Sequence, residues 1–160
     1  MKTVSDLVKK AIEHEVNASA FYDQAAEMTN DDEARMVFLE LVDIEDGHCQ
    51  DLIKIFSKNS ALSEYDIQGY YEELSDSVKA NISLEELRSI KNSGLRDVLE
   101  MAVAFEQKAV QTYSGLIEHL PDQELKMFCA KLLEEEKRHE KTLSTLLDNL
   151  DMDMEEHPAL

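Results

Sequence analysis

Two glutamate–histidine pairs share the same spacing, since Glu45 precedes His48 and Glu136 precedes His139 by three residues. Residues three apart on a helix lie on one face, so each pair can offer a carboxylate oxygen and an imidazole nitrogen to one metal ion. A single pair of this kind is common on solvated helix surfaces. Here both pairs interrupt runs of apolar residues, where a buried charge is costly without a partner. The two pairs therefore predict metal binding.

Two further glutamates, Glu15 and Glu106, interrupt apolar stripes on two other segments. Each stripe follows the alternating three- and four-residue spacing of a helix face that packs inside a bundle. All four stripes are chiefly apolar except at the middle. They comprise Val8, Ala11, Glu15, Ala18, Tyr22 and Ala25; Phe38, Leu41, Glu45, His48, Leu52 and Ile55; Leu99, Ala102, Glu106, Ala109, Tyr113 and Leu116; and Cys129, Leu132, Glu136, His139, Leu143 and Leu146.

Charge balance indicates two metal ions. Four buried carboxylates carry a charge of −4, which two divalent cations would neutralise, while each neutral imidazole adds one nitrogen ligand. Oxygen-rich coordination with open positions suits iron or manganese better than structural zinc, which prefers closed sets of Cys and His. The alternative is a bundle without metal, in which protonated glutamates are hydrogen-bonded to the histidines and tyrosines.

The chain also repeats itself with an offset of 91 residues. The repeat spans residues 11–56, and most of the matched positions lie on the stripes. Each half is therefore predicted to be a helical hairpin, and the halves resemble tandem copies. The matched pairs are Glu15 with Glu106, Ala18 with Ala109, Tyr22 with Tyr113, Met36 with Met127, Leu41 with Leu132, Glu45 with Glu136, His48 with His139 and Leu52 with Leu143.

Neighbouring polar residues compete for the same roles. Glu13 is close to Glu15, but only Glu15 has a glutamate at the matching position of the repeat. His14 points about 100° away from its neighbour on a helix and is expected to be exposed. The run Glu134–Glu136 is expected to form a solvated face, with Glu136 as the exception.

Two tyrosines, Tyr22 and Tyr113, follow the glutamates of their stripes by seven residues. Their hydroxyl groups either orient ligand carboxylates from behind or belong to core aromatic residues that find local partners. Recurrence at the same offset favours the first interpretation.

The composition favours an all-α protein, because the chain has only four Gly and two Pro and is rich in helix-forming residues. The sequences TNDDE and LPDQE break the periodicity and supply capping residues. At 160 residues the chain suits a single domain. We predict an antiparallel four-helix bundle of two hairpins, occupying residues 1–150, with helices at about 3–28, 31–57, 94–119 and 122–150.

Residues 58–93 are long enough to cross from one end of such a bundle to the other. Within them, Ser83 and Glu86 have the spacing of a capping box, which predicts a short helix. The tyrosines of this crossover, Tyr65, Tyr70 and Tyr71, either cover the bundle or contact a second subunit. Residues 151–160 are predicted to be a flexible acidic tail.

The net charge of −19, from 35 acidic and 16 basic residues, opposes binding to nucleic acid or to anionic membranes. No apolar run approaches the roughly 18 residues that suggest a membrane span, so a cytoplasmic location is expected. Cys49 and Cys129 lie outside any CxxC motif and are expected to be buried free thiols rather than redox partners.

The arrangement of Glu15, Glu45-x-x-His48, Glu106 and Glu136-x-x-His139 resembles the ferritin-like di-iron carboxylate proteins, in particular the rubrerythrin-like group. The resemblance covers the four long helices, and it includes the tyrosine that follows the first ligand in rubrerythrin-like helices. It implies a ferritin-like fold and two iron ions, with manganese or zinc as alternatives, held by these six residues.

The sequence also departs from that group. Rubrerythrins carry an additional ligand glutamate three residues after the glutamate at position 106, where this chain has Ala109. They commonly carry a rubredoxin-type domain with a four-cysteine iron site, for which this chain lacks the cysteines. The remaining ligand set is closer to bacterioferritin, whereas the long crossover and acidic tail look less like a cage-forming subunit.

The resemblance implies a di-iron oxidoreductase that reduces peroxide or dioxygen, or oxidises ferrous iron. Its reductant would come from an external electron-donor protein, and we expect a homodimer. The alternative is a non-catalytic, iron-handling protein.

Overall fold

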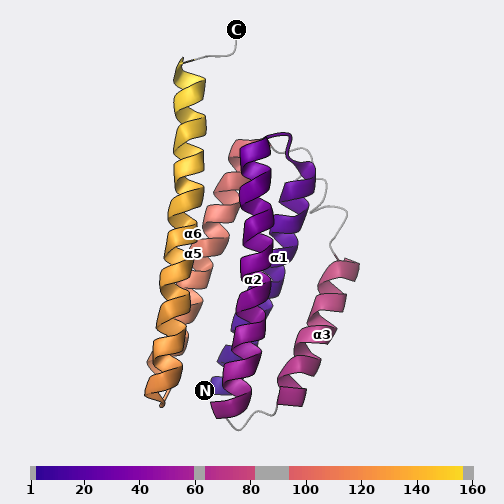
Figure 1. Ribbon diagram of the computed structural model, residues 1–160, viewed down its shortest axis with the longest axis vertical. Coiled ribbons are helices and arrows are strands. Elements are labelled where there is room, and N and C mark those ends of the chain that lie inside the picture. Colours follow the sequence, from indigo (N-terminus) through magenta and orange to yellow (C-terminus); the bar gives the residue numbers. More distant parts are fainter. Residues whose placement is uncertain (1–2, 60–63, 82–93, 157–160) are drawn as a thin grey trace.

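The computed structural model describes residues 3–59, 64–81 and 94–156, which form helices and contain no strand (Figure 1). The all-α prediction is confirmed. The helices that carry the four stripes pack as a bundle, with α1 against α2, α5 against α6, and α1 against α5. The elements are α1 (Val4–Met28), α2 (Asp32–Asn59), α3 (Glu64–Asn81), α5 (Leu95–His119) and α6 (Gln123–Glu156).

Short polar side chains set the ends of the bundle helices. Thr3 and Asp6 form a capping box at the start of α1, in which each side chain accepts from the other residue's backbone N–H. Asp31 accepts from the N–H of Ala34 at 2.8 Å at the start of α2. Asp122 accepts from the N–H of Glu124 at 2.7 Å at the start of α6. The two predicted breaks therefore do supply caps, and each makes its pair of helices a tight hairpin.

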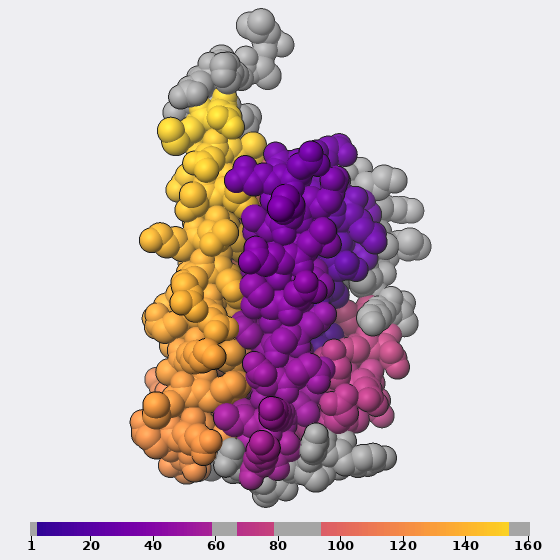
Figure 2. All heavy atoms as spheres, viewed as in Figure 1, coloured from indigo at the N-terminus to yellow at the C-terminus, as the bar shows by residue number. Residues whose placement is uncertain are grey.

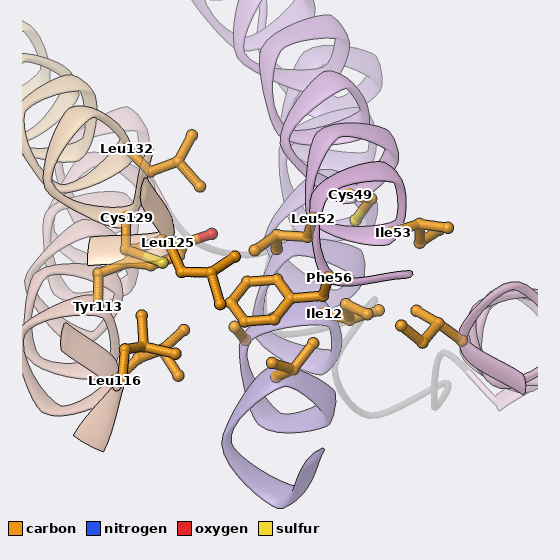
Figure 3. Packing of buried hydrophobic residues seen from close by; sticks show 14 of the residues in the cluster. Ile12, Cys49, Leu52, Ile53, Phe56, Tyr113, Leu116, Leu125, Cys129 and Leu132 are labelled. Carbon is orange, nitrogen blue, oxygen red and sulfur yellow. The ribbon is translucent and has the colours of Figure 1, made fainter. Parts of the chain in front are cut away.

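Two apolar clusters form the core, one toward each end of the bundle. The first includes Val8 and Ile12 of α1 with residues of α2, α5 and α6, and Figure 3 shows Leu52 and Phe56 of α2 pointing into it. The second begins at Ala18 on α1 and lies toward the other end. Glu15 and its counterparts on the other three helices occur between these clusters. The apolar ends of the four stripes thus form two cores, and their polar middles form a layer that separates them.

Helix α3 is a difference from the sequence analysis, which predicted no helix in this part of the crossover. It lies beside α1 and α2, on the side away from α5 and α6 (Figure 1). Ile67 is buried, and the aromatic rings of Tyr70 and Tyr71 pack against the first core cluster. Apolar residues at Ile67, Tyr70, Leu74 and Val78 have helical spacing, which is the signal that could have revealed it. Tyr70 and Tyr71 therefore cover the bundle.

Helix α6 is longer than predicted, because it continues through Glu156 instead of ending near residue 150. The predicted flexible tail is therefore wrong for residues 151–156. Leu147 and Leu150, which precede the added turns, pack against the second cluster, and Asp151, the first residue beyond the predicted end, pairs with Arg96 of α5 at 2.5 Å. Figure 2 shows this end of α6 standing beyond the neighbouring helices. The predicted short helix at Ser83 and the side chain of Tyr65 lie outside the described residues.

Both cysteines, Cys49 and Cys129, are buried and free, as predicted. Burial raises the pKa of both thiols, that of Cys129 to about 12, so they pack as small apolar side chains. Within the described residues, none of the helices is long and apolar enough to cross a membrane.

Candidate metal centre

The polar layer brings the six predicted ligands together in two overlapping groups. Glu15, Glu45, His48 and Glu136 form the first group, and one ligand atom from each lies within 4.8 Å of the others. We call this group position 1. The Nδ1 atom of His48 lies 2.9 Å from Glu136 Oε1, 3.2 Å from Glu45 Oε2 and 3.5 Å from Glu15 Oε1. One nitrogen of His48 therefore faces three carboxylates that come from three different helices.

The second group, which we call position 2, mirrors the first. Glu45, Glu106, Glu136 and His139 again place one ligand atom each within 4.8 Å of the others. The Nδ1 atom of His139 lies 3.2 Å from Glu136, 3.6 Å from Glu45 and 3.7 Å from Glu106. Positions 1 and 2 share Glu45 and Glu136. The two imidazole rings lie nearly parallel, with centroids 6.0 Å apart and an angle of 17° between the planes.

The donor set fits a pair of metal ions. All four glutamates are almost completely buried, at 0–1% exposure. Three buried carboxylate oxygens have no hydrogen-bond partner among the described residues: Glu15 Oε2, Glu106 Oε2 and Glu136 Oε1. Glu136 Oε1 does lie 2.9 Å from His48 Nδ1, but the contact does not have the geometry of a hydrogen bond. Buried carboxylate oxygens are rarely left unpaired, because their desolvation costs several kcal/mol. Two divalent ions would supply the missing partners and neutralise the four carboxylates.

Without metal, protons balance the carboxylate charge. Burial, and next the charge of Glu45, raises the pKa of Glu15 to about 8. Burial also raises the pKa of Glu106, to about 7. Burial acts to lower the pKa of both histidines, but hydrogen bonds to the surrounding carboxylates outweigh it. The pKa of His48 is held well above its ordinary value, and that of His139 rises to about 11. Metal ions would displace these protons on binding.

The two tyrosines donate to carboxylates across the bundle. Tyr22 of α1 donates its hydroxyl to Glu106 of α5, and Tyr113 of α5 donates to Glu15 of α1. Each tyrosine thus orients the glutamate of the other hairpin, and both are fully buried. Burial, and next the nearby carboxylate, raises the pKa of both hydroxyls well above the ordinary value, so both keep their protons.

A family model described as a ferritin-like domain matches residues 3–149. The chain belongs to the ferritin-like family. No curated protein and no solved structure matches it. The match covers the four bundle helices and all six predicted ligands, and the buried layer is where a ferritin-like protein would hold metal. Assignment of this ferritin-like chain to the rubrerythrin-like group stays a prediction.

Two residues of this ferritin-like protein differ from the predictions made for them. His14 is buried rather than exposed, at 7% exposure, because α5 covers that side of α1 and the Phe105 ring lies 6.0 Å from the imidazole. Glu135 is only partly solvated, because its side chain is 24% exposed and contacts His48 at 2.7 Å. The repeat concealed Glu135, since the matching residue is Ile44. The signal that could have found it is chemical: a ligand histidine needs an acceptor for its other ring N–H.

Replacing Tyr113 with Phe should destabilise the metal-free ferritin-like protein, because it leaves one more buried oxygen of Glu15 without a donor. Leaving a buried acceptor without its donor costs about 1–3 kcal/mol, so we expect the free energy of unfolding to fall by that amount. Urea denaturation with a chelator present measures it. Tyr70→Phe is the matched control, because Tyr70 lies on α3 outside the polar layer. Equal effects of both substitutions would contradict the role assigned to Tyr113.

Proposed function

We propose that the polar layer binds two iron ions and that the protein is a di-iron oxidoreductase. Its substrates would be hydrogen peroxide, dioxygen or ferrous iron itself. The observation that supports this best is the overlap of positions 1 and 2, because the shared Glu45 and Glu136 can bridge two ions. Three carboxylates and one imidazole at each position leave room for a small molecule on a metal that takes six ligands.

The residues of the chain would hold, balance and isolate the metal pair. Two bound ferrous ions would supply the two electrons that, with two protons, convert one hydrogen peroxide to two water molecules. Glu45 and Glu136 would keep the ions adjacent, and the apolar clusters on both sides of the layer exclude bulk water. The hydroxyls of Tyr22 and Tyr113 hold in place the carboxylates of Glu106 and Glu15, each of which belongs to only one position. The electrons would be restored by an external electron-donor protein.

The function can be tested by loading the metal-free protein anaerobically with two ferrous ions per chain and then adding peroxide. We expect rapid oxidation with one peroxide consumed per two ferrous ions, followed by continued peroxide consumption when an external reductant is supplied. The increase in ferric absorbance and the loss of peroxide measure these two results. The control is Glu45→Gln, which removes a carboxylate shared by both positions. Oxidation no faster than in this variant would refute the proposal.

A second candidate is an iron-handling protein without turnover. The net charge of −19 favours it, because an acidic surface attracts cations to the centre. Air or peroxide distinguishes the two candidates. The iron-handling protein would bind two ferrous ions and release them to a chelator without consuming peroxide catalytically, whereas the oxidoreductase would turn over in the presence of reductant.

A further inference from the structure

Glu135 reaches from α6 to a ligand histidine on α2. Its Oε2 atom lies 2.7 Å from Nε2 of His48, and its side chain is 24% exposed. The opposite ring nitrogen, Nδ1, faces the carboxylates of position 1. His48 is therefore held at both ring nitrogens, whereas the side chain of Glu135 keeps one edge toward solvent.

This contact has a direct consequence for metal binding. When Nε2–H is donated to a carboxylate, the lone pair of Nδ1 is directed toward the metal and becomes more basic. The hydrogen bond also restricts rotation of the imidazole ring. Removing such a carboxylate typically lowers metal affinity about 10- to 100-fold. Glu135 is therefore placed to strengthen position 1 without contacting the metal.

The tandem repeat shows that position 2 lacks this support. The residue that matches Glu135 is Ile44, which lies on α2 and cannot accept a hydrogen bond. All the carboxylate contacts of His139 are made by Nδ1, and among the described residues its Nε2 has no hydrogen-bond partner. The His139 side chain is also more exposed, at 13% against 4% for His48. The two histidines thus have similar metal-facing surroundings and different support behind the ring.

We propose that Glu135 is a positioning residue for His48 that makes the two metal positions unequal, so that position 1 binds metal more tightly than position 2. This inference depends on the proposed metal-binding function. Tighter binding at position 1 sets the order in which the two positions are occupied. The protein would therefore fill in order, with position 1 first.

Single-position variants allow the two sites to be measured separately. Glu106→Gln weakens position 2 and leaves position 1, whereas Glu15→Gln weakens position 1 and leaves position 2. Co²⁺ is a suitable probe because it takes the same nitrogen and oxygen ligands as ferrous iron and has visible absorption bands that depend on its ligands. Calorimetry and these bands report binding without any measurement of activity.

In the Glu106→Gln background, Glu135→Ala should lower Co²⁺ affinity about 10- to 100-fold. In the Glu15→Gln background the same substitution should leave affinity unchanged. Glu135→Gln, which keeps a neutral acceptor, should restore part of the loss. The substitution is on a partly exposed side chain, and circular dichroism checks that each variant folds. A purely structural role for Glu135 would weaken both backgrounds equally, and that result would overturn the inference.

A variant with the opposite expected effect adds a carboxylate behind the histidine of position 2. Ile44→Glu places a carboxylate at the matching point of the repeat, so it should raise Co²⁺ affinity in the Glu15→Gln background and not in the Glu106→Gln background. In the otherwise unaltered protein, Glu135→Ala should make the two binding steps more nearly equal. If Glu135→Ala left the affinities of both binding steps unchanged, the inference would be overturned. If the protein without substitutions bound no Co²⁺, the proposed function itself would be overturned.

Discussion

Replacing Glu45 with Gln should abolish tight binding at both metal positions, whereas replacing Glu15 with Gln should abolish it at one. Glu45 belongs to both ligand groups, and Glu15 belongs only to position 1. Removing one charged partner from a buried, charge-balanced set costs about 3–5 kcal/mol, which corresponds to an affinity loss of roughly 100- to 4000-fold. Gln keeps the size of the side chain, so the loss reports charge and ligation rather than a cavity.

Equilibrium dialysis with ferrous iron under anaerobic conditions measures the number of ions bound per chain. We expect two for the unaltered protein, one for Glu15→Gln and none for Glu45→Gln at iron concentrations that just saturate the unaltered protein. Glu13→Gln is the matched control, because Glu13 lies on α1 two residues from Glu15 and belongs to neither group. A stoichiometry of two in Glu45→Gln would contradict the bridging role.

The second large effect is a pH dependence that metal removes. In the metal-free protein, Glu15 and Glu106 have folded-state pKa values of about 8 and about 7, against 4.5 for ordinary glutamate. Between these values the folded protein retains protons that the unfolded chain has released. Stability therefore falls as pH rises, by up to about 1.4 kcal/mol per pH unit for each retained proton. Above about pH 6.5 the raised pKa of His48 and that of His139 act in the same direction.

Metal binding should reverse this trend, because the ions replace the protons and compete best where the ligands are deprotonated. Each occupied site adds about 2.7 kcal/mol when free metal is 100 times its dissociation constant. Urea denaturation at pH 5–8, with chelator or with two ferrous ions per chain in the absence of air, measures both curves. We expect them to diverge as pH rises. Metal-free protein whose stability rose across this range would contradict the account.

The control for the pH dependence is the double variant of Glu15→Gln and Glu106→Gln. It removes the two carboxyl groups that take up protons on folding below pH 6.5. Its metal-free stability should therefore change little between pH 5 and pH 6.5, where the stability of the unaltered protein already declines.

The sequence predicts the centre of this molecule well because charged residues occupy positions there that the helical pattern predicts to be buried. Glu136 and His139 stand in a stripe that is otherwise apolar, and the repeat places Glu45 and His48 in the same relation. Only a fold that brings these residues together can compensate their burial, so the bundle and the convergence follow from one argument. The structure shows that convergence. That the six residues bind metal stays a prediction.

Periodicity and repeat matching are less informative where one half of the molecule differs from the other. The residue that matches Glu135 in the repeat is an isoleucine, so the repeat does not mark Glu135 as functional. His14 is buried by a residue of a neighbouring helix, Phe105, and the periodicity of its own helix does not predict that contact. The crossover has no counterpart in the second half, so the repeat does not indicate α3, although Ile67 and Leu74 have helical spacing. The contact between Asp151 and Arg96 near the end of α6 joins residues 55 apart in sequence, which the periodicity of a single helix does not indicate.

The most direct test is to locate the metal in crystals grown with ferrous iron, by anomalous diffraction at the iron absorption edge. The account predicts two adjacent peaks between the four bundle helices, one against Glu15 and His48, the other against Glu106 and His139, with Glu45 and Glu136 contacting both. Peaks confined to the acidic surface, or a centre without iron at saturating concentrations, would contradict it.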